Sequence, residues 1–203
     1  MLLAFTGAGI SAASGIPTFQ DQDGIRDKLD RHFANTHPQE YQATIQMMAD
    51  ICRKAEPNDA HRALVDYDIP VITMNVDELH QRAGSQHVLP VHGSLFDGTI
   101  VLYGDPAPRY SDAESWVGKL REGDIFLIVG TSYYTNISFL LKRLALRMGA
   151  DVIEVNDHAE TKLREELEAH KDCIEPFEAF MAREDSESLP PVRPPYSGGW
   201  EQP

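Results

Sequence analysis

Cysteine is scarce in this chain: its 203 residues include only Cys52 and Cys173. Two isolated thiols argue against a disulfide framework, and they are too few for a zinc site built from four cysteines. The protein is therefore expected to work in a reducing, cytoplasmic setting.

Long apolar runs are also missing from the sequence. No run approaches the roughly 20 residues that a membrane-spanning helix needs, so a membrane is not an expected partner. The first apolar run begins directly after Met1 and leaves no room for the charged and apolar regions of a signal peptide. No signal peptide is therefore expected.

Basic side chains are few, with 18 Lys and Arg against 32 Asp and Glu and a formal net charge of −14. Binding to a phosphate backbone needs clustered Lys and Arg, so no nucleic acid is an expected partner. The negative charge favours a cationic partner such as a lysine-rich peptide. A simpler explanation is that the charge only keeps the protein soluble.

Short apolar runs alternate with helical stretches along most of the chain. This alternation is typical of an α/β fold, in which helices cover both faces of a parallel sheet. The expected strands are residues 2–5, 70–74, 88–89, 100–103, 125–129 and 152–155. The expected helices are residues 60–67, 113–120, 137–148, 160–169 and 174–182.

Two segments break this alternation. Residues 25–57 are polar and contain no strand-like run, so we expect a small helical insert that covers the cofactor side. The alternative is a crossover with a long loop. Residues 183–203 are rich in Pro, Ser, Gly and acidic residues and cannot bury a core, so we expect a disordered tail after a domain of residues 1–182.

The most informative segment runs from Thr6 to Phe19 and reads TGAGISAASGIPTF. It follows an expected strand, and a helix is expected to begin at Ile10. Gly7 and Gly9 would let backbone N–H groups approach a pyrophosphate, and a helix N-terminus would add partial positive charge there. A short glycine pattern often serves only a tight turn. The continuation SGIPTF is far less generic.

Polar residues follow the next two expected strands, at the sheet edge where open α/β folds bind ligands. Asn75 and Asp77 offer an amide and a carboxylate, which together can bind a carboxamide such as that of nicotinamide. Asp77 could instead form an Asx turn or cap a helix. His92 is placed to act as a general base, because an imidazole pKa lies near neutrality. The other histidines are interpreted as structural or exposed.

The last two strands end in the same way. Gly130, Thr131 and Ser132 follow one of them, and Asn156 follows the other. Their backbone N–H groups, hydroxyls and amide could hold a phosphate or a ribose. Alternatively, these residues could only stabilise the turns that follow the two strands and bind no ligand.

Together these segments resemble the motifs of the sirtuin family in order and approximate spacing: GAGIS with SGIPxF, then NxDxLHxxAG, HGS, GTS and a final strand that ends in Asn. The resemblance covers roughly residues 2–180. It implies a Rossmann-like sheet that binds NAD and an NAD-dependent protein-lysine deacetylase, which releases nicotinamide and acyl-ADP-ribose. The alternative is NAD hydrolysis or ADP-ribosyl transfer in the same pocket.

The resemblance also implies roles for individual residues. His92, Asn75 and Asp77 would be catalytic, with His92 as the base that activates a ribose hydroxyl. An acylated lysine peptide or protein would pair with Val101, Tyr103 and Gly104 by strand addition. The residues expected to bind NAD are Gly7, Ala8, Gly9, Ser11, Ile16, Phe19, Gln20, Met74, Asn75, Asp77, Gly130, Thr131, Ser132, Asn156 and Cys173.

The sequence departs from the family pattern at several places. Gln20 stands where the family usually has Arg, and Met74 stands where it usually has Gln. Five residues join Ser94 to Ile100 where the family usually inserts a zinc module with two cysteine pairs, so no metal is expected. The Tyr and Arg pair of acidic-acyl removal is not evident at residues 46–50. The sequence leaves the oligomeric state open.

Overall fold

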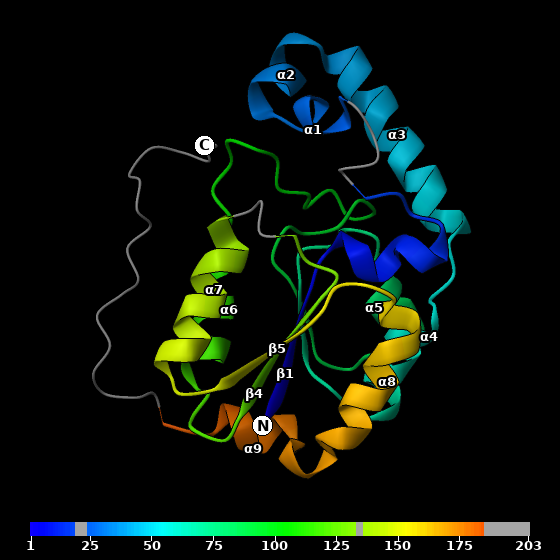
Figure 1. The fold of residues 1–203 in the computed structure, drawn as a ribbon. Helices are drawn as coiled ribbons and strands as arrows, with labels where there is room; N and C mark the ends of the chain where they lie inside the picture. Colours follow the sequence, from blue (N-terminus) through cyan, green and yellow to red (C-terminus); the bar gives the residue numbers. More distant parts are fainter. Residues whose placement is uncertain (19–23, 133–135, 185–203) are drawn as a thin grey trace.

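A five-stranded parallel sheet forms the centre of the protein in the computed structural model, which describes residues 1–18, 24–132 and 136–184 (Figure 1). The strand order is β3-β2-β1-β4-β5, and each neighbouring pair is parallel. The strands are β1 (Leu2–Thr6), β2 (Val71–Thr73), β3 (Val88–Pro90), β4 (Ile125–Val129) and β5 (Asp151–Val155). The predicted Rossmann-like α/β fold is thus confirmed.

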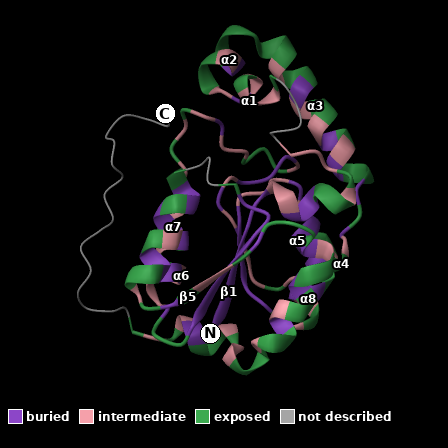
Figure 2. Cartoon of the chain, viewed as in Figure 1, coloured by how far each residue is buried: buried purple, intermediate pink, exposed green. Residues whose placement is uncertain are grey.

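The central strands are apolar along their whole length because both of their faces are covered. All five residues of β1 and all five of β4 are buried, and the two strands pair in register from Leu2↔Ile125 to Thr6↔Val129. Strands buried on both faces are expected to be continuous apolar runs rather than alternating ones. Figure 2 shows the buried colour concentrated in this part of the sheet.

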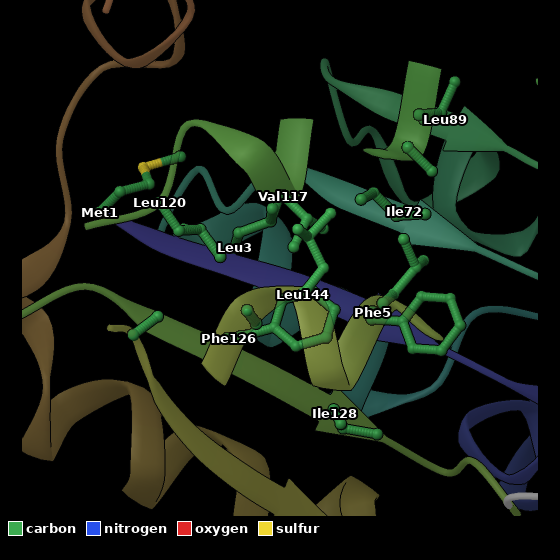
Figure 3. Packing of buried hydrophobic residues seen from close by; sticks show 14 of the residues in the cluster. Met1, Leu3, Phe5, Ile72, Leu89, Val117, Leu120, Phe126, Ile128 and Leu144 are labelled. Carbon is green, nitrogen blue, oxygen red and sulfur yellow. The ribbon is translucent and has the colours of Figure 1, made fainter. Parts of the chain in front are cut away.

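Helices pack on both faces of the sheet (Figure 1). On one face, Leu3 and Phe5 belong to a cluster with residues of α6 (Tyr110–Gly118), α7 (Asn136–Arg147) and α9 (Phe177–Met181). Figure 3 shows this cluster, in which the rings of Phe5 and Phe126 stack with centroids 6.0 Å apart.

On the other face, Leu2 and Ala4 pack with residues of α4 (Asp59–Asp66) and α8 (Ala159–Ala169). Successive side chains of β1 therefore serve opposite layers, as the alternation of a strand requires. The short helix α5 (Leu79–Ala83) follows β2 and contributes the fully buried Leu79.

Three helices lie beyond the carboxyl ends of the strands, above the sheet in Figure 1. They are α1 (Ile25–Lys28), α2 (Arg31–Thr36) and α3 (Pro38–Lys54), which fall within the segment expected to form a helical insert. We call residues 25–54 the insert and the sheet with its covering helices the body. A small apolar cluster packs Leu29 and Ala34 of the insert against Leu102, which lies in the segment after β3.

Three predicted elements were wrong in type or extent. The helix expected to begin at Ile10 is instead a 3₁₀ helix, η1 (Ala8–Ser14). Residues 100–103 form no strand, because the chain turns back at Gly104 and only Tyr103 bridges to Asp30. The single helix expected over 174–182 is η2 (Lys171–Cys173) followed by α9, because Pro176 disfavours a helical residue before it.

Two further findings concern the chain as a whole. None of the helices within the described ranges is long and apolar enough to cross a membrane. The predicted tail lies outside the described residues from residue 185 onward.

Candidate functional site

The strand order reverses between β1 and β4, and ligands of open α/β folds bind in the crevice beyond such a reversal. The loops that follow these two strands lie against each other. The N–H of Gly7 donates to the carbonyl of Val129 at 3.0 Å, and the N–H of Gly9 donates to the carbonyl of Gly130 at 2.8 Å. The structure thus brings the predicted Gly7–Gly9 and Gly130–Ser132 segments together.

Gly9 and Gly130 are needed for this close approach. A Cβ on Gly9 would lie 2.7 Å from the Cα of Gly130, and a Cβ on Gly130 would lie 2.2 Å from the Ile10 nitrogen. The N–H groups of Gly7 and Gly9 were expected to approach a pyrophosphate. In the structure they instead donate to Val129, at the end of β4, and to Gly130, just after it. Moreover, η1 is a seven-residue 3₁₀ helix and provides no long helix dipole.

The ends of β4 and β5 are joined by a side chain. The Thr131 N–H donates to Oδ1 of Asn156 at 3.0 Å, and the Thr131 side chain is buried. Ser132 is exposed beside it. Thr131, Ser132 and Asn156 therefore lie at the same edge of the sheet as the glycine loops.

Ser11 links the two polar residues that follow β2. The Asn75 amide donates from Nδ2 to Ser11 Oγ at 3.0 Å, and Ser11 Oγ donates to Asp77 Oδ2 at 2.7 Å. The Asn75 N–H donates to Thr73 Oγ1 at 3.0 Å, which fixes the start of this loop. The β1 and β2 loops are thus held together by a chain of three side chains.

Asp77 is a buried carboxyl group, with 4% of its surface exposed. Burial raises its pKa, while the hydrogen bonds from the Leu79 N–H and from Ser11 act in the opposite direction. The bond from Leu79 to Asp77 Oδ1, at 2.9 Å, is the Asx-type contact that the sequence left open as an alternative. One oxygen of Asp77 therefore accepts a hydrogen bond at the start of α5, and the other accepts a hydrogen bond from Ser11.

His92 lies just beyond β3 and is partly buried. Burial lowers its pKa to about 4, and a hydrogen bond with the backbone of Met74 acts in the opposite direction. The imidazole is therefore uncharged at neutral pH and retains a nitrogen lone pair that can accept a proton.

The segment after His92 closes into a tight loop. A Cβ on Gly93 would lie 2.1 Å from the carbonyl oxygen of Thr99, and the Ser94 N–H donates to Thr99 Oγ1 at 3.0 Å. The Val101 N–H then returns to the carbonyl of His92 at 2.9 Å. Five residues are thus enough to close the chain between Ser94 and Ile100.

A cleft opens between the body and the insert, with about 570 Å³ of empty space when the part open to solvent is counted. Six of the predicted residues line it: Ala8, Ser11, Ile16, Met74, Asn75 and Asp77. Sequence reasoning missed the wall formed by α3, to which Met48, Ile51 and Cys52 contribute. Their i, i+3, i+4 spacing was the available signal, since such residues share one face of a helix.

Cys52 is buried in this wall, and burial raises the pKa of its thiol to about 12. The thiol is therefore protonated at neutral pH and acts as a small apolar side chain.

Asn58 is another residue that sequence reasoning missed. Its Nδ2 donates to the Ile10 carbonyl at 2.7 Å and to Ser14 Oγ at 3.0 Å, which anchors η1 to the start of α4.

The other predicted cofactor-binding residues are not among the described residues that line the cleft. Six of them lie on the loops that follow β1, β4 and β5: Gly7, Gly9, Gly130, Thr131, Ser132 and Asn156. Phe19 and Gln20 lie outside the described residues. Cys173 lies in η2, after α8 has run back along the sheet, and packs against the cluster around Leu2. It is therefore at the amino ends of the strands, away from the cleft, and the structure does not support its predicted role (Figure 1).

Two other histidines are buried in the body, as a structural interpretation requires. His80 Nε2 lies 2.9 Å from Thr6 Oγ1, and the rings of His61 and His80 have centroids 4.9 Å apart. Burial lowers the pKa of His61 to about 4 and that of His80 well below its usual value. Both are therefore uncharged at neutral pH.

The expected peptide-binding edge is already partly paired. The Tyr103 N–H donates to the Leu29 carbonyl at 2.9 Å, and the Arg31 N–H donates to the Tyr103 carbonyl at 2.8 Å. A peptide could not form these two bonds with Tyr103 while the insert does.

Among the described residues, no cluster of three or more His, Cys, Asp or Glu could hold a metal ion.

Comparisons with known proteins match residues 7–99 to the model of the Sir2 family. The chain is 31% identical over 202 residues to NAD-dependent protein deacylase 2 of Archaeoglobus fulgidus, covering 76% of this chain and 79% of the relative. It is 33% identical over 196 residues to the NAD-dependent protein deacylase of Aeropyrum pernix, covering 76% and 80%. A solved Sir2 homolog–NAD complex shares the fold, with a TM-score of 0.74, 23% identity and coverage of 84% of this chain and 89% of that chain.

Proposed function

Because the chain belongs to the Sir2 family, we propose that it is an NAD-dependent protein deacylase, which removes acyl groups from lysine side chains. One observation carries the proposal most directly. Asn75 and Asp77 are joined through Ser11 at one end of the cleft, and His92 hydrogen-bonds with the backbone of Met74 beside them. A carboxamide-binding pair and an uncharged base thus lie on adjacent loops.

The polar groups in the cleft fit NAD. The carboxamide of nicotinamide contains both a donor and an acceptor, and the Asn75 amide with the Asp77 carboxyl offers the complementary groups. The apolar side chains of Met48 and Ile51 suit the flat face of the ring. Bound NAD would supply the ribose from which nicotinamide leaves and to which the acyl group passes.

The remaining predicted residues are assigned by position. The loops Gly7–Ser11 and Gly130–Ser132 flank the reversal between β1 and β4, so we assign them to the phosphates and adjacent ribose. Asn156 follows β5, and we assign it to the adenosine end. The amide and hydroxyl groups there match the hydrogen-bonding groups of a ribose.

His92 is the proposed base. Since its pKa is about 4, the imidazole is uncharged at neutral pH and can accept the proton of a ribose hydroxyl. The same nitrogen can return that proton once the acyl group has passed to the ribose. Asp77, held by Ser11 and Leu79, would position the nicotinamide end in the earlier step, before nicotinamide leaves.

The decisive experiment is to incubate the protein with NAD and an acetyl-lysine peptide and to resolve the products by mass. A deacylase produces nicotinamide, a peptide lighter by one acetyl group, and acyl-ADP-ribose. Free ADP-ribose with an intact peptide, or a peptide that carries ADP-ribose, would contradict the deacylase proposal.

NAD hydrolysis or ADP-ribosyl transfer in the same cleft is the second candidate function. It is favoured by the pairing of Tyr103 with Leu29 and Arg31, which occupies part of the edge where a peptide would add a strand. Met74 also stands where the family usually has Gln, and a thioether is only a weak acceptor. The same product analysis separates these reactions from deacylation.

A further inference from the structure

Glu78 has an unusual backbone conformation at the start of α5. Its φ is 59° and its ψ is 17°, in the left-handed region that favours glycine, and it lies directly after Asp77. The other described non-glycine residues with positive φ are Asp68 and His158. Strained residues cluster at functional sites when the surrounding structure holds them in place.

The Glu78 carboxylate has a specific partner. Ser94 Oγ donates to Glu78 Oε1 at 2.5 Å, a short contact typical of a hydroxyl that donates to a charged group. Ser94 is buried, and its Oγ also accepts from the Phe96 N–H at 3.0 Å. The hydroxyl is therefore fixed at both its donor and its acceptor sides.

This bond connects the two loops that carry the proposed catalytic groups. Glu78 belongs to the loop of Asn75 and Asp77, and Ser94 belongs to the loop of His92. One backbone bond joins the same loops, from the Leu95 N–H to the Val76 carbonyl at 3.1 Å. Two side-chain hydrogen bonds also join these loops: the contact between Glu78 and Ser94, and the bond between His92 and the backbone of Met74.

We propose that Glu78 is a positioning residue for catalysis. It acts through Ser94 to keep the loop of His92 in a fixed position relative to Asn75 and Asp77. The inference rests on the proposed deacylase function. Binding of the nicotinamide end needs only the Asn75 loop, whereas acyl transfer needs that loop and His92 together. The two steps should therefore respond differently when the contact is lost, because small misplacements of a catalytic group slow a reaction strongly.

The test variant is Glu78→Gly, which removes the carboxylate and also relieves the strained backbone. Asp68→Gly is the matched control, because it relieves the same kind of strain at an exposed turn between α4 and β2. Both variants should have a Tm equal to or above that of the wild type. Glu78→Gly should lower kcat for deacylation about tenfold and change NAD–nicotinamide exchange much less, whereas Asp68→Gly should change neither.

Two further variants sharpen the result. Glu78→Gln keeps an acceptor for Ser94 and should recover most of the lost kcat. Ser94→Ala should lower kcat as Glu78→Gly does, and the double variant should be no slower than the worse single one, since both remove one contact. Amide hydrogen exchange at residues 92–96 should become faster in Glu78→Gly without any substrate present.

Wild-type kcat in Glu78→Gly, or an equal loss in deacylation and nicotinamide exchange together with a lower Tm, would overturn the inference. A wild-type protein that neither releases nicotinamide nor transfers an acyl group would instead overturn the proposed function. In that case the hydrogen-exchange comparison still decides the inference, since unchanged exchange at residues 92–96 would mean that Glu78 does not hold this loop.

Discussion

The body and the insert are stabilised in different ways. The body has two apolar clusters, one on each face of the sheet, and residues such as Leu3, Phe5 and Phe126 in them are fully buried. The insert has a cluster with only three buried members. It is fastened to the segment after Ile100 by Arg31, which forms a two-pronged ion pair with Asp105 at 2.6 and 2.8 Å.

The body and the insert also contribute different kinds of residues to the cleft and its surroundings. The body contributes Asp77 to the lining of the cleft, and His92 lies on an adjacent loop that is hydrogen-bonded to the loop of Asp77 through Met74. The insert contributes apolar wall residues, such as Met48 and Cys52. A rigid body that carries the chemistry and a more loosely held insert that closes over it would explain this division, because elements with few buried contacts open at low free energy.

The largest effect on activity is expected from His92→Ala in the body. Turnover should fall by about 10²–10⁴-fold, the range for loss of a positioned base, with little change in Tm. Cys52→Ala, in the insert wall of the cleft, is the matched comparison and should change turnover only a few-fold, since its thiol is protonated. Equal effects of the two variants in steady-state kinetics would contradict the division of roles.

The largest effect on stability is expected from Phe126→Ala. Truncating this buried ring should lower the free energy of unfolding by about 3–5 kcal/mol, which denaturant titration can measure. Leu102→Ala is the counterpart at the insert and should lower it by about 2 kcal/mol, the low end of the range for such truncations, because its cluster has only three buried members. A larger loss from Leu102→Ala would show that the insert is as firmly packed as the body.

The nicotinamide end of the cleft is tested by Asp77→Asn and Asn75→Ala. Each should weaken inhibition by nicotinamide about tenfold or more, the scale for a lost hydrogen bond to a charged group, and weaken ADP-ribose binding much less. Calorimetric titration with each ligand provides the measurement. An equal loss of affinity for ADP-ribose would indicate that these residues only shape the loop.

A smaller effect is expected from Arg31→Ala, which breaks the contact between the insert and Asp105. This pair is partly exposed and contributes at most about 1 kcal/mol, so global Tm should hardly change while hydrogen exchange in residues 25–36 becomes faster. The hydrogen bond from Arg31 lowers the pKa of Asp105. The contact is therefore complete at neutral pH and is lost as the pH falls through that lowered pKa.

Comparing wild-type protein with Arg31→Ala as the pH is lowered provides a control for the role of Asp105. In wild-type protein, exchange in residues 25–36 should become faster as the pH is lowered through the Asp105 transition, after correction for the intrinsic exchange rate. In Arg31→Ala this additional change should be absent. A wild-type pH response that persists unchanged in the variant would assign it to another group.

The smallest effect is expected from metal removal. Cys52 and Cys173 are far apart in sequence, and the loop from Ser94 to Ile100 closes on its own hydrogen bonds. We therefore expect well under one zinc per chain, and a chelator should leave Tm unchanged because no metal binding is coupled to folding. Stoichiometric zinc, or a large drop in Tm with chelator, would show that the insert or its neighbouring loop is organised by metal.

The body was predictable from the sequence because its strands are continuous apolar runs. The run at 125–129 matches β4 residue for residue, and Asn75, Asp77 and His92 were chosen as candidate site residues because they follow such runs. The run at 100–103 misled for a physical reason. Its apolar residues serve the insert cluster through Leu102 rather than a further strand of the sheet.

The contacts between loops were not predictable, since they depend on where distant backbones meet. Nothing in the sequence indicates that the Gly9 N–H donates to Gly130, or that Ser11 would join Asn75 to Asp77. Glu78 is a clearer case. Its preference for helical backbone gives no sign of a left-handed conformation, nor of the hydrogen bond from Ser94.

The direct backbone contact between Gly9 and Gly130 restricts how this cleft can diversify. No side chain of any chemistry fits between the two loops, so every substitution at either glycine meets the same steric barrier. The wall residues Met48, Ile51 and Leu95 face open space and face no such barrier. In a library of all single substitutions, survivors should therefore concentrate in the cleft walls, and new ligand preferences should arise there while Gly9 and Gly130 stay fixed.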